Sequence, residues 1–337
     1  MQLGMIGLGR MGGNMRDRLR AAGHEVVGYD PRPDVTDVES LQALADALEA
    51  PRVVWIMVPS GDPTRETVQK LADVLAPGDL VIDGGNSRYT DDGPNAALLD
   101  EKGIGYVDCG VSGGIWGRDN GYGLMAGGTD EHIDRAMPIF DALRPDGARE
   151  EGFAHAGPVG AGHFAKMVHN GIEYGLMQAY AEGYELMAAS ELITNVTGTI
   201  QAWSRGTVVR SWLLDLLVLA LKDDPGLGRL SDYVEDSGEG RWTIEEAIRH
   251  AVPLPVISAA LFARFTSRQE SSPAMKAVAA LRHQFGGHAV REVGPSGVPG
   301  QLAGPSSGTG TTEPQSGSVE AQAGPTSGTG AASDASD

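Results

Sequence analysis

Short apolar runs alternate with longer helix-like stretches over about the first 150 residues of the chain. Each run is bounded by Gly, Pro or Asp, and the expected strands cover residues 3–6, 26–29, 53–58, 80–83 and 105–107. This alternation is typical of βαβ units, which build a parallel sheet. We therefore predict a Rossmann-type α/β domain over residues 1–155.

The pattern changes at about His163, where the strand signals stop and long helical stretches rich in Ala, Leu, Met and Glu begin. These stretches continue to about Gln284 and predict an all-α domain over residues 156–291. Residues 292–337 are mostly Gly, Ser, Thr, Ala and Pro, with acidic but no basic side chains. Such a segment cannot bury enough apolar surface to offset its ordering entropy, so we expect a disordered tail there.

Composition narrows the class of protein. The chain lacks an apolar run long enough to span a membrane, and its N-terminus does not read as a secretory signal. The single cysteine, Cys109, excludes an internal disulfide, and a formal net charge of −19 argues against nucleic-acid binding. We expect a soluble, cytoplasmic protein without membrane or nucleic-acid partners, in which any anion site gathers its cations locally.

A glycine-rich turn follows the first expected strand and opens a helix. Its residues are Gly7, Leu8, Gly9, Arg10, Met11 and Gly12. Glycines at this spacing let the chain turn tightly and let backbone N–H groups approach a pyrophosphate at the helix N-terminus. The turn predicts a dinucleotide site, to which we also assign Val58, at the end of the third strand.

The acid that ends the second strand bears on the choice of dinucleotide. Asp30 is placed to accept hydrogen bonds from the ribose hydroxyls and repels a 2′-phosphate, which favours NAD. Arg32 could instead pair with that phosphate, so NADP stays open.

A helical segment at the start of the second domain carries four polar side chains on one face. Lys166, Asn170, Glu173 and Tyr174 follow at i, i+4, i+7 and i+8. Lysine can act as a base and glutamate as an acid where burial shifts their pKa values. The alternative is a solvated stripe in which Lys166 and Glu173 are surface charges.

Two glycine-rich loops follow expected strands and should lie at the carboxyl edge of the sheet, where open α/β sheets bind ligands. The first holds Asn86, and the second holds Ser112, Gly113 and Gly114. The tryptophans of the helical domain fit core positions better than ligand contacts, and they are Trp203, Trp212 and Trp242.

These blocks together give the chain a family resemblance. It resembles the 6-phosphogluconate dehydrogenases, within the wider β-hydroxyacid dehydrogenases, from about residue 1 to 290. The nucleotide turn, the Asp83-Gly-Gly-Asn-Ser-Arg-Tyr loop, the Gly110-Val-Ser-Gly-Gly loop and the segment Gly162-His-Phe-Ala-Lys-Met-Val-His-Asn-Gly-Ile-Glu-Tyr all match. After Gly114 the chain reads Ile-Trp-Gly-Arg, where longer members carry acidic residues. With the short helical domain, this is similar to the compact bacterial or archaeal form, which is often described as preferring NAD.

The resemblance implies oxidative decarboxylation of 6-phosphogluconate to ribulose 5-phosphate, a step of the oxidative pentose phosphate pathway, without a metal. It makes Lys166 the general base and Glu173 the general acid, with Asn170 beside them. The residues implied to hold the carboxylate and hydroxyls are Asn86, Ser112, Gly113, Gly114, His169 and Asn170. Asn86 would also contact the cofactor.

For the substrate phosphate the resemblance implies Tyr174, Arg241 and Arg264, although the family usually has lysine where Arg241 stands. Arg282 and His288 match a C-terminal contribution that reaches the site of a partner subunit. The helical domain would then bind substrate and mediate dimerisation, and the enzyme would be a homodimer or homotetramer.

Two alternatives remain. Another β-hydroxyacid dehydrogenase, such as a 3-hydroxyisobutyrate-type enzyme, shares the lysine–asparagine helix but does not need Glu173, Tyr174 or the arginines. A noncatalytic dinucleotide sensor would be expected to lack Lys166 or Glu173, and both are present.

Overall fold

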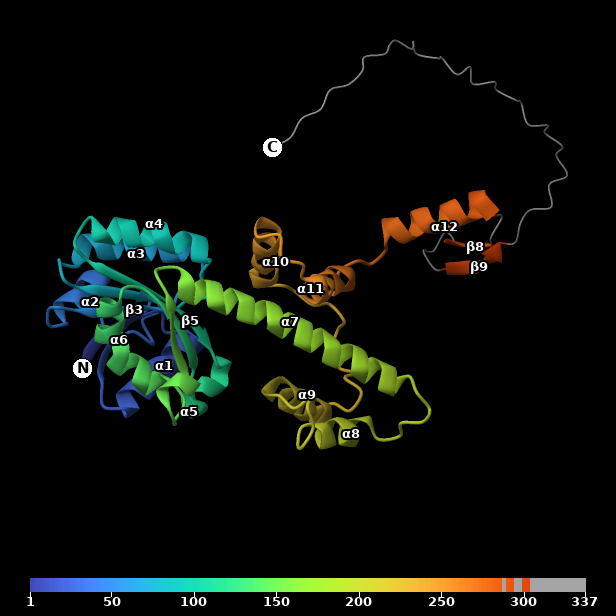
Figure 1. Ribbon diagram of the computed structural model, residues 1–337, viewed down its shortest axis with the longest axis horizontal. Coiled ribbons are helices and arrows are strands. Elements are labelled where there is room, and N and C mark those ends of the chain that lie inside the picture. The colour runs from blue at the N-terminus through green and yellow to red at the C-terminus, as the bar shows by residue number, and fades with distance from the viewer. Residues whose placement is uncertain (287–288, 294–298, 304–337) are drawn as a thin grey trace, which may run out of the picture. The chain divides into compact units, whose positions relative to one another are not determined.

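The computed structural model describes residues 1–286, 289–293 and 299–303 of the chain (Figure 1). The chain forms two compact units, residues 1–269 and 270–337. The first unit holds a sheet domain and a helical domain, so the candidate site lies within it.

A seven-stranded sheet forms the N-terminal part of the first unit. Its strands are β1 (Gln2–Ile6), β2 (Glu25–Tyr29), β3 (Val53–Ile56), β4 (Leu80–Asp83), β5 (Gly105–Ser112), β6 (Gly123–Gly127) and β7 (Phe153–Gly157). The order is β2-β1-β3-β4-β5-β6-β7, and every pair is parallel except β5–β6. The predicted Rossmann-type class is confirmed, whereas β6 and β7 were not predicted.

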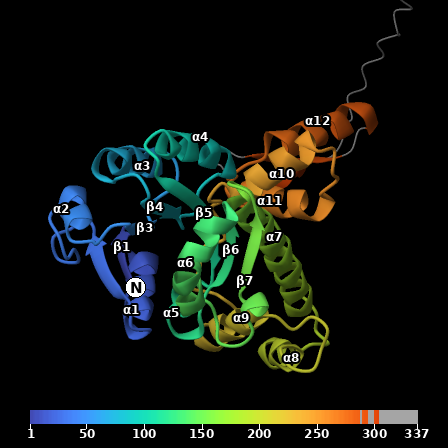
Figure 2. The same cartoon turned by 60° about the vertical axis from the view of Figure 1, so that its left-hand side comes forward.

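Helices cover both faces of the sheet (Figure 2). The helices on one face are α1 (Arg10–Ala21), α5 (Gly117–Asn120) and α6 (Asp130–Leu143). Those on the other face are α2 (Leu41–Asp46), α3 (Asp62–Val74) and α4 (Tyr89–Asp100). Two short 3₁₀ turns, η1 (Gly114–Trp116) and η2 (Arg149–Glu151), complete this part. The central strands are buried on both faces, which explains their continuous apolar runs.

The second part of this unit is helical, as predicted. It consists of α7 (Ala161–Ala188), α8 (Val196–Trp203), α9 (Trp212–Asp223), α10 (Glu239–Arg249) and α11 (Pro255–Ser267). Helix α7 packs its first turns against β5 and β6, and it also contacts α10 and α11. Among the described residues, we find no helix with the combined length and apolarity that a bilayer crossing requires.

The second unit contains α12 (Pro273–Gly286) and an antiparallel pair, β8 (Val290–Val293) with β9 (Pro299–Ala303). The tail predicted over residues 292–337 starts within β8. Residues 294–298 and 304–337 lie outside the described residues, so disorder there stays a prediction.

Asp108 of β5 ties the sheet to the start of α7. Its carboxylate, which is fully buried, accepts hydrogen bonds from the backbone N–H of Gly160 (2.6 Å) and of His163 (2.8 Å). A carboxylate at a helix N-terminus also interacts favourably with the helix dipole. On the same turn, the His163 ring lies 2.9 Å from the buried carboxylate of Asp92 in α4. These contacts fix where α7 begins and therefore where its side chains point.

We expect Asp108→Ala to lower the free energy of unfolding by about 3 kcal/mol, because two buried N–H groups would lose a charged acceptor. Urea denaturation measures the change. The control is Asp100→Ala, which removes an exposed acid at the end of α4. Equal stabilities of the two variants would contradict the role of Asp108.

Candidate active site

The glycine-rich turn lies between β1 and α1, as its sequence predicts. A Cβ on Gly12 would overlap the carbonyl oxygen of Gly7, so only glycine lets the helix start this close to the turn. Among the described residues, no side chain caps the N-terminus of α1. Its first N–H groups and the helix dipole are thus left for an anion, which fits a dinucleotide pyrophosphate.

Asp30 and Arg32 form a hydrogen-bonded ion pair beside this turn. One Asp30 oxygen accepts from Arg32 Nε (2.8 Å) and from the Arg32 backbone N–H (3.0 Å). The other accepts from the Leu8 backbone N–H (2.8 Å) and from Arg32 Nη2 (3.1 Å). The hydrogen bond from Arg32 is the main cause that lowers the pKa of Asp30 to about 2. The carboxylate is therefore ionised, and Arg32 is engaged with it rather than free for a phosphate.

A cleft of about 1020 Å³ lies between the sheet edge and the helical domain. Its walls come from the two glycine-rich loops, from the start of α1, from α7, and from α9, α10 and α11 with the segment before α10. Residues from the predicted site on these walls are Met11, Asn86, Ser112, Gly113, Gly114, Lys166, His169, Asn170, Glu173, Tyr174 and Arg264. Its size suits a sugar acid together with one ring of a cofactor.

The amine of Lys166 is central to the α7 wall. Nζ donates a hydrogen bond to Asn170 Oδ1 (2.6 Å) and lies 3.2 Å from His169 Nδ1. The other ring nitrogen of His169 lies 3.3 Å from Ser112 Oγ, which links this group to the end of β5. A Cβ on Gly110 would overlap the Lys166 side chain, so the close approach of strand and helix depends on that glycine.

Burial lowers the pKa of Lys166, while the charges of Glu173 and Glu239 raise it. Burial also lowers the pKa of His169, and the Lys166 charge adds to that effect. Lowering the pKa of a lysine increases the fraction of its neutral amine, which can act as a base. Glu173, two turns beyond Lys166 on α7, is half-buried, and one of its carboxylate oxygens lies 3.9 Å from His169 Nδ1.

The far wall of the cleft pairs an arginine with a tyrosine. The Arg264 guanidinium stacks over the buried Tyr174 ring, 3.5 Å from its centroid, and donates to the Glu235 carbonyl (3.2 Å). The Tyr174 hydroxyl accepts a hydrogen bond from the backbone N–H of Ser237 (3.4 Å). These contacts fix the plane of the Arg264 guanidinium. Its remaining N–H groups can donate hydrogen bonds to an anion.

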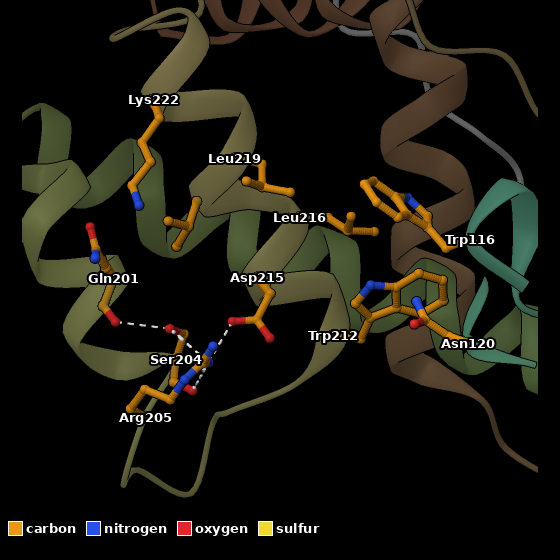
Figure 3. A pocket seen from close by; sticks show the side chains of 11 residues that line it. Trp116, Asn120, Gln201, Ser204, Arg205, Trp212, Asp215, Leu216, Leu219 and Lys222 are labelled. Carbon is orange, nitrogen blue, oxygen red and sulfur yellow. Dashed lines mark hydrogen bonds and ion pairs between the residues drawn. The ribbon is translucent and has the colours of Figure 1, made fainter. Parts of the chain in front are cut away.

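A second cavity, of about 430 Å³, adjoins the cleft between α8, α9 and the segment from Trp116 to Asn120 (Figure 3). Trp116 and Trp212 line both hollows. The expectation that Trp212 belongs to the core is wrong, because its side chain is 48% exposed. The buried face of α9 is formed instead by Leu214, Val218 and Leu221.

Comparison with known proteins assigns the family. Residues 2–146 match the model of the NAD binding domain of 6-phosphogluconate dehydrogenase, and residues 162–294 match its C-terminal domain. The chain is 39% identical to an NAD-dependent, decarboxylating 6-phosphogluconate dehydrogenase of Haloferax volcanii, over 86% of this chain and 98% of that protein. This chain belongs to the 6-phosphogluconate dehydrogenase family.

Two further relatives differ in length. A putative 6-phosphogluconate dehydrogenase of Bacillus subtilis is 37% identical over 87% of this chain and all of that protein. A solved 6-phosphogluconate dehydrogenase of Plasmodium falciparum superposes with a TM-score of 0.73 at 27% identity, covering 85% of this chain and 65% of that chain. The matched part of this chain thus spans all of the Bacillus relative but only 65% of the parasite enzyme.

Not every residue that the family resemblance suggested lies at the cleft. Arg241 is paired with the Asp236 carboxylate at 2.6 and 3.1 Å, and its guanidinium lies over the Phe265 ring. It does not line the cleft in this structure. Arg282 is an exposed residue of α12, in the second unit, and His288 lies outside the described residues.

Sequence reasoning missed three polar residues on the cleft wall, Ser211, Ser237 and Glu239. Glu239 is only 2% exposed, and its carboxylate accepts from the Asn86 amide and from Ser237 Oγ (2.7 Å). The one available signal was position, since Glu239 is two residues before Arg241. Its contact with Asn86 spans 153 residues, and no local pattern reveals such a contact.

We expect Asp30→Ala to weaken NAD binding and to strengthen NADP binding, changing the ratio of the two affinities by about tenfold or more. The substitution removes the carboxylate that repels a 2′-phosphate and frees Arg32 to bind it. Fluorescence titration with NADH and NADPH measures both affinities. Asp34→Ala, at an exposed acid near Arg32, is the control and should leave the ratio unchanged. An unaltered ratio in Asp30→Ala would argue against this account of cofactor choice.

Proposed function

We propose that this protein oxidises and decarboxylates 6-phospho-D-gluconate to D-ribulose 5-phosphate and CO₂, with reduction of NAD in preference to NADP. The observation that carries the proposal is the shared cleft in which Lys166, Glu173 and Arg264 all lie beside the two sheet-edge loops. The Haloferax relative bears this activity in its name, and the match covers nearly its whole length.

Lys166 acts as the general base in this proposal. Its neutral amine takes the proton of the substrate 3-hydroxyl as hydride leaves C3. The nicotinamide, when bound, accepts that hydride. Burial favours the neutral amine, and Asn170 fixes the direction in which Nζ points.

The product of oxidation is a β-keto acid, so loss of CO₂ leaves an enediolate. Lys166, now protonated, stabilises the developing negative charge on the oxygen at C3, and no metal is required for this. Ser112 and His169 are hydrogen-bonded to each other at the same wall and are placed to contact substrate oxygens.

Glu173 then protonates the former C2 of the substrate, which becomes C1 of the ketose as the enediol rearranges. It lies on the same face of α7 as Lys166, seven residues along the helix, so the base and the acid are presented from one rigid element. This separation by two turns allows the two groups to reach different carbons of one substrate.

Arg264 and Tyr174 bind the phosphate. A guanidinium fork can donate two parallel hydrogen bonds to a phosphate, and stacking on Tyr174 limits its motion. Arg241 would join them only by leaving Asp236, so we assign it a smaller part than Arg264.

Initial rates test the reaction. We expect turnover of 6-phosphogluconate with NAD to exceed that of 3-hydroxyisobutyrate, and Lys166→Met to lower kcat by a factor of roughly 10² or more while NADH still binds. Lys70→Met, at an exposed lysine of α3, is the matched control. Preference for 3-hydroxyisobutyrate would favour the related hydroxyacid dehydrogenases, and cofactor binding without any turnover would favour a sensor. Wild-type turnover in Lys166→Met would remove the proposed base.

We further propose that the protein works as a homo-oligomer in which Arg282 and His288 serve a neighbouring site. The helical part leaves several large apolar side chains exposed, including Leu186 at 74%, Leu192 at 89% and Val208 at 99%. An apolar surface of this kind is typical of a face that a second subunit covers.

Mixing inactive variants tests the shared site. Lys166→Met and Arg282→Ala should each be impaired alone, whereas their co-expression should restore about a quarter of wild-type activity for a dimer. Half of the dimers would be hybrids, and each hybrid would contain one complete site. Sedimentation velocity checks the assembly. A monomer at all concentrations, or no recovery in the mixed protein, would rule out the shared site.

A further inference from the structure

Glu239 is unusual because it places a buried carboxylate on the wall of a cleft that receives an anionic substrate. It is the first residue of α10, where a negative charge interacts favourably with the helix dipole. That structural role explains an acid at this position, but it does not explain why the carboxylate reaches across to the loop after β4.

The contacts of the carboxylate define how Asn86 is oriented. An ionised carboxylate can only accept hydrogen bonds, so the amide nitrogen of Asn86 must be the atom that faces Glu239. The Asn86 carbonyl oxygen is therefore turned away from Glu239. Within the described residues, this oxygen accepts no hydrogen bond, and Asn86 lines the cleft. Asn86 thus offers the cleft an acceptor.

The second oxygen of Glu239 links it to the phosphate wall. It accepts from Ser237 Oγ at 2.7 Å, and the Ser237 backbone N–H donates to the Tyr174 hydroxyl under Arg264. Both carboxylate oxygens are consequently engaged. The side chain has little freedom to rotate toward bulk water.

The charge of Glu239 also acts on the catalytic amine. The charged or titratable groups that face Lys166 are His169 and Glu173 from α7 and Glu239 from α10. Ser112 of β5 contacts His169 and is linked to Lys166 only through that ring. Glu239 opposes the effect of burial on Lys166, because its negative charge stabilises the protonated amine.

We propose that Glu239 is a positioning residue of this active site, which turns the Asn86 amide so that its oxygen accepts from a ligand N–H or O–H and places a negative charge facing Lys166. The inference rests on the proposed function for the identity of the substrate. Two ligand groups have the required donor, the carboxamide of nicotinamide and a hydroxyl of the sugar acid.

A double-mutant cycle tests the effect on Asn86. Binding of NADH by fluorescence and of 6-phosphogluconate by calorimetry is measured for Asn86→Ala, Glu239→Ala and the double variant. We expect each single change to weaken binding of one of the two ligands about threefold to tenfold, as for one lost hydrogen bond. The double variant should bind within about twofold of Asn86→Ala, since the two residues act through one contact. The ligand that is weakened identifies the donor.

Glu239→Gln separates the charge from the geometry. Glutamine keeps an acceptor for the Asn86 amide, so both affinities should stay within about twofold of wild type. Loss of the negative charge lowers the pKa of Lys166, so the low-pH limb of kcat/KM should move to lower pH by roughly half a unit or more. Glu246→Gln is the matched control, because Glu246 is a buried glutamate of the same helix that does not line the cleft. It should leave the limb and both affinities unchanged.

Each of three results would overturn the proposal. The first is that the losses of binding in the double-mutant cycle are additive, and the second is that Glu239→Ala binds both ligands as wild type does. The third is that the low-pH limb of kcat/KM in Glu239→Gln equals that of wild type. Thermal unfolding checks that every variant folds. If Glu239→Ala does not fold, the pH limb of Glu239→Gln decides alone. A wild-type protein that binds NADH but not 6-phosphogluconate would contradict the proposed substrate, while the NADH titrations would still test Asn86.

Discussion

The active site depends on the junction between β5 and the first turn of α7. Asp108 holds the N-terminus of that helix through two backbone hydrogen bonds, and Gly110 lets the strand approach within contact of Lys166. Every residue on the catalytic face of α7 is placed by this junction, because a helix transmits the position of its first turn to those that follow. The sheet therefore positions the base as directly as it positions the nucleotide turn.

The balance of charge in the cleft follows from the same geometry. A buried amine favours its neutral form, and two carboxylates, Glu173 and Glu239, oppose this from different helices. The protein is strongly acidic, with a formal net charge of −19, so attraction of an anionic substrate has to be local. Arg264 provides that attraction at the far wall, where stacking on Tyr174 holds it in place.

Much of the fold and part of the site could be predicted from local sequence. The five strands expected from apolar runs are present, because strands buried on both faces need such runs. Strands β6 and β7 were missed, since Gly-Leu-Met-Ala-Gly and Phe-Ala-His-Ala-Gly contain no β-branched residue and are stabilised by pairing with neighbours.

The catalytic face of α7 follows from helical spacing alone. Glu239 and the exposed Trp212 do not, because their environments come from segments that are distant in the sequence. The pairing of Arg241 with Asp236, five residues earlier, was not predicted either, although the two residues are close in the sequence.

Helix α7 has 28 residues, which corresponds to a length of about 42 Å. Lys166 and Glu173 occupy its first half, nearest the sheet, while its last turns pack against α8 and α9 through Tyr180, Tyr184 and Met187. When a rod held at one end bends, its displacement grows with distance from that end. The reacting groups therefore lie where bending of α7 moves them least, nearer the sheet than the turns that contact α8 and α9.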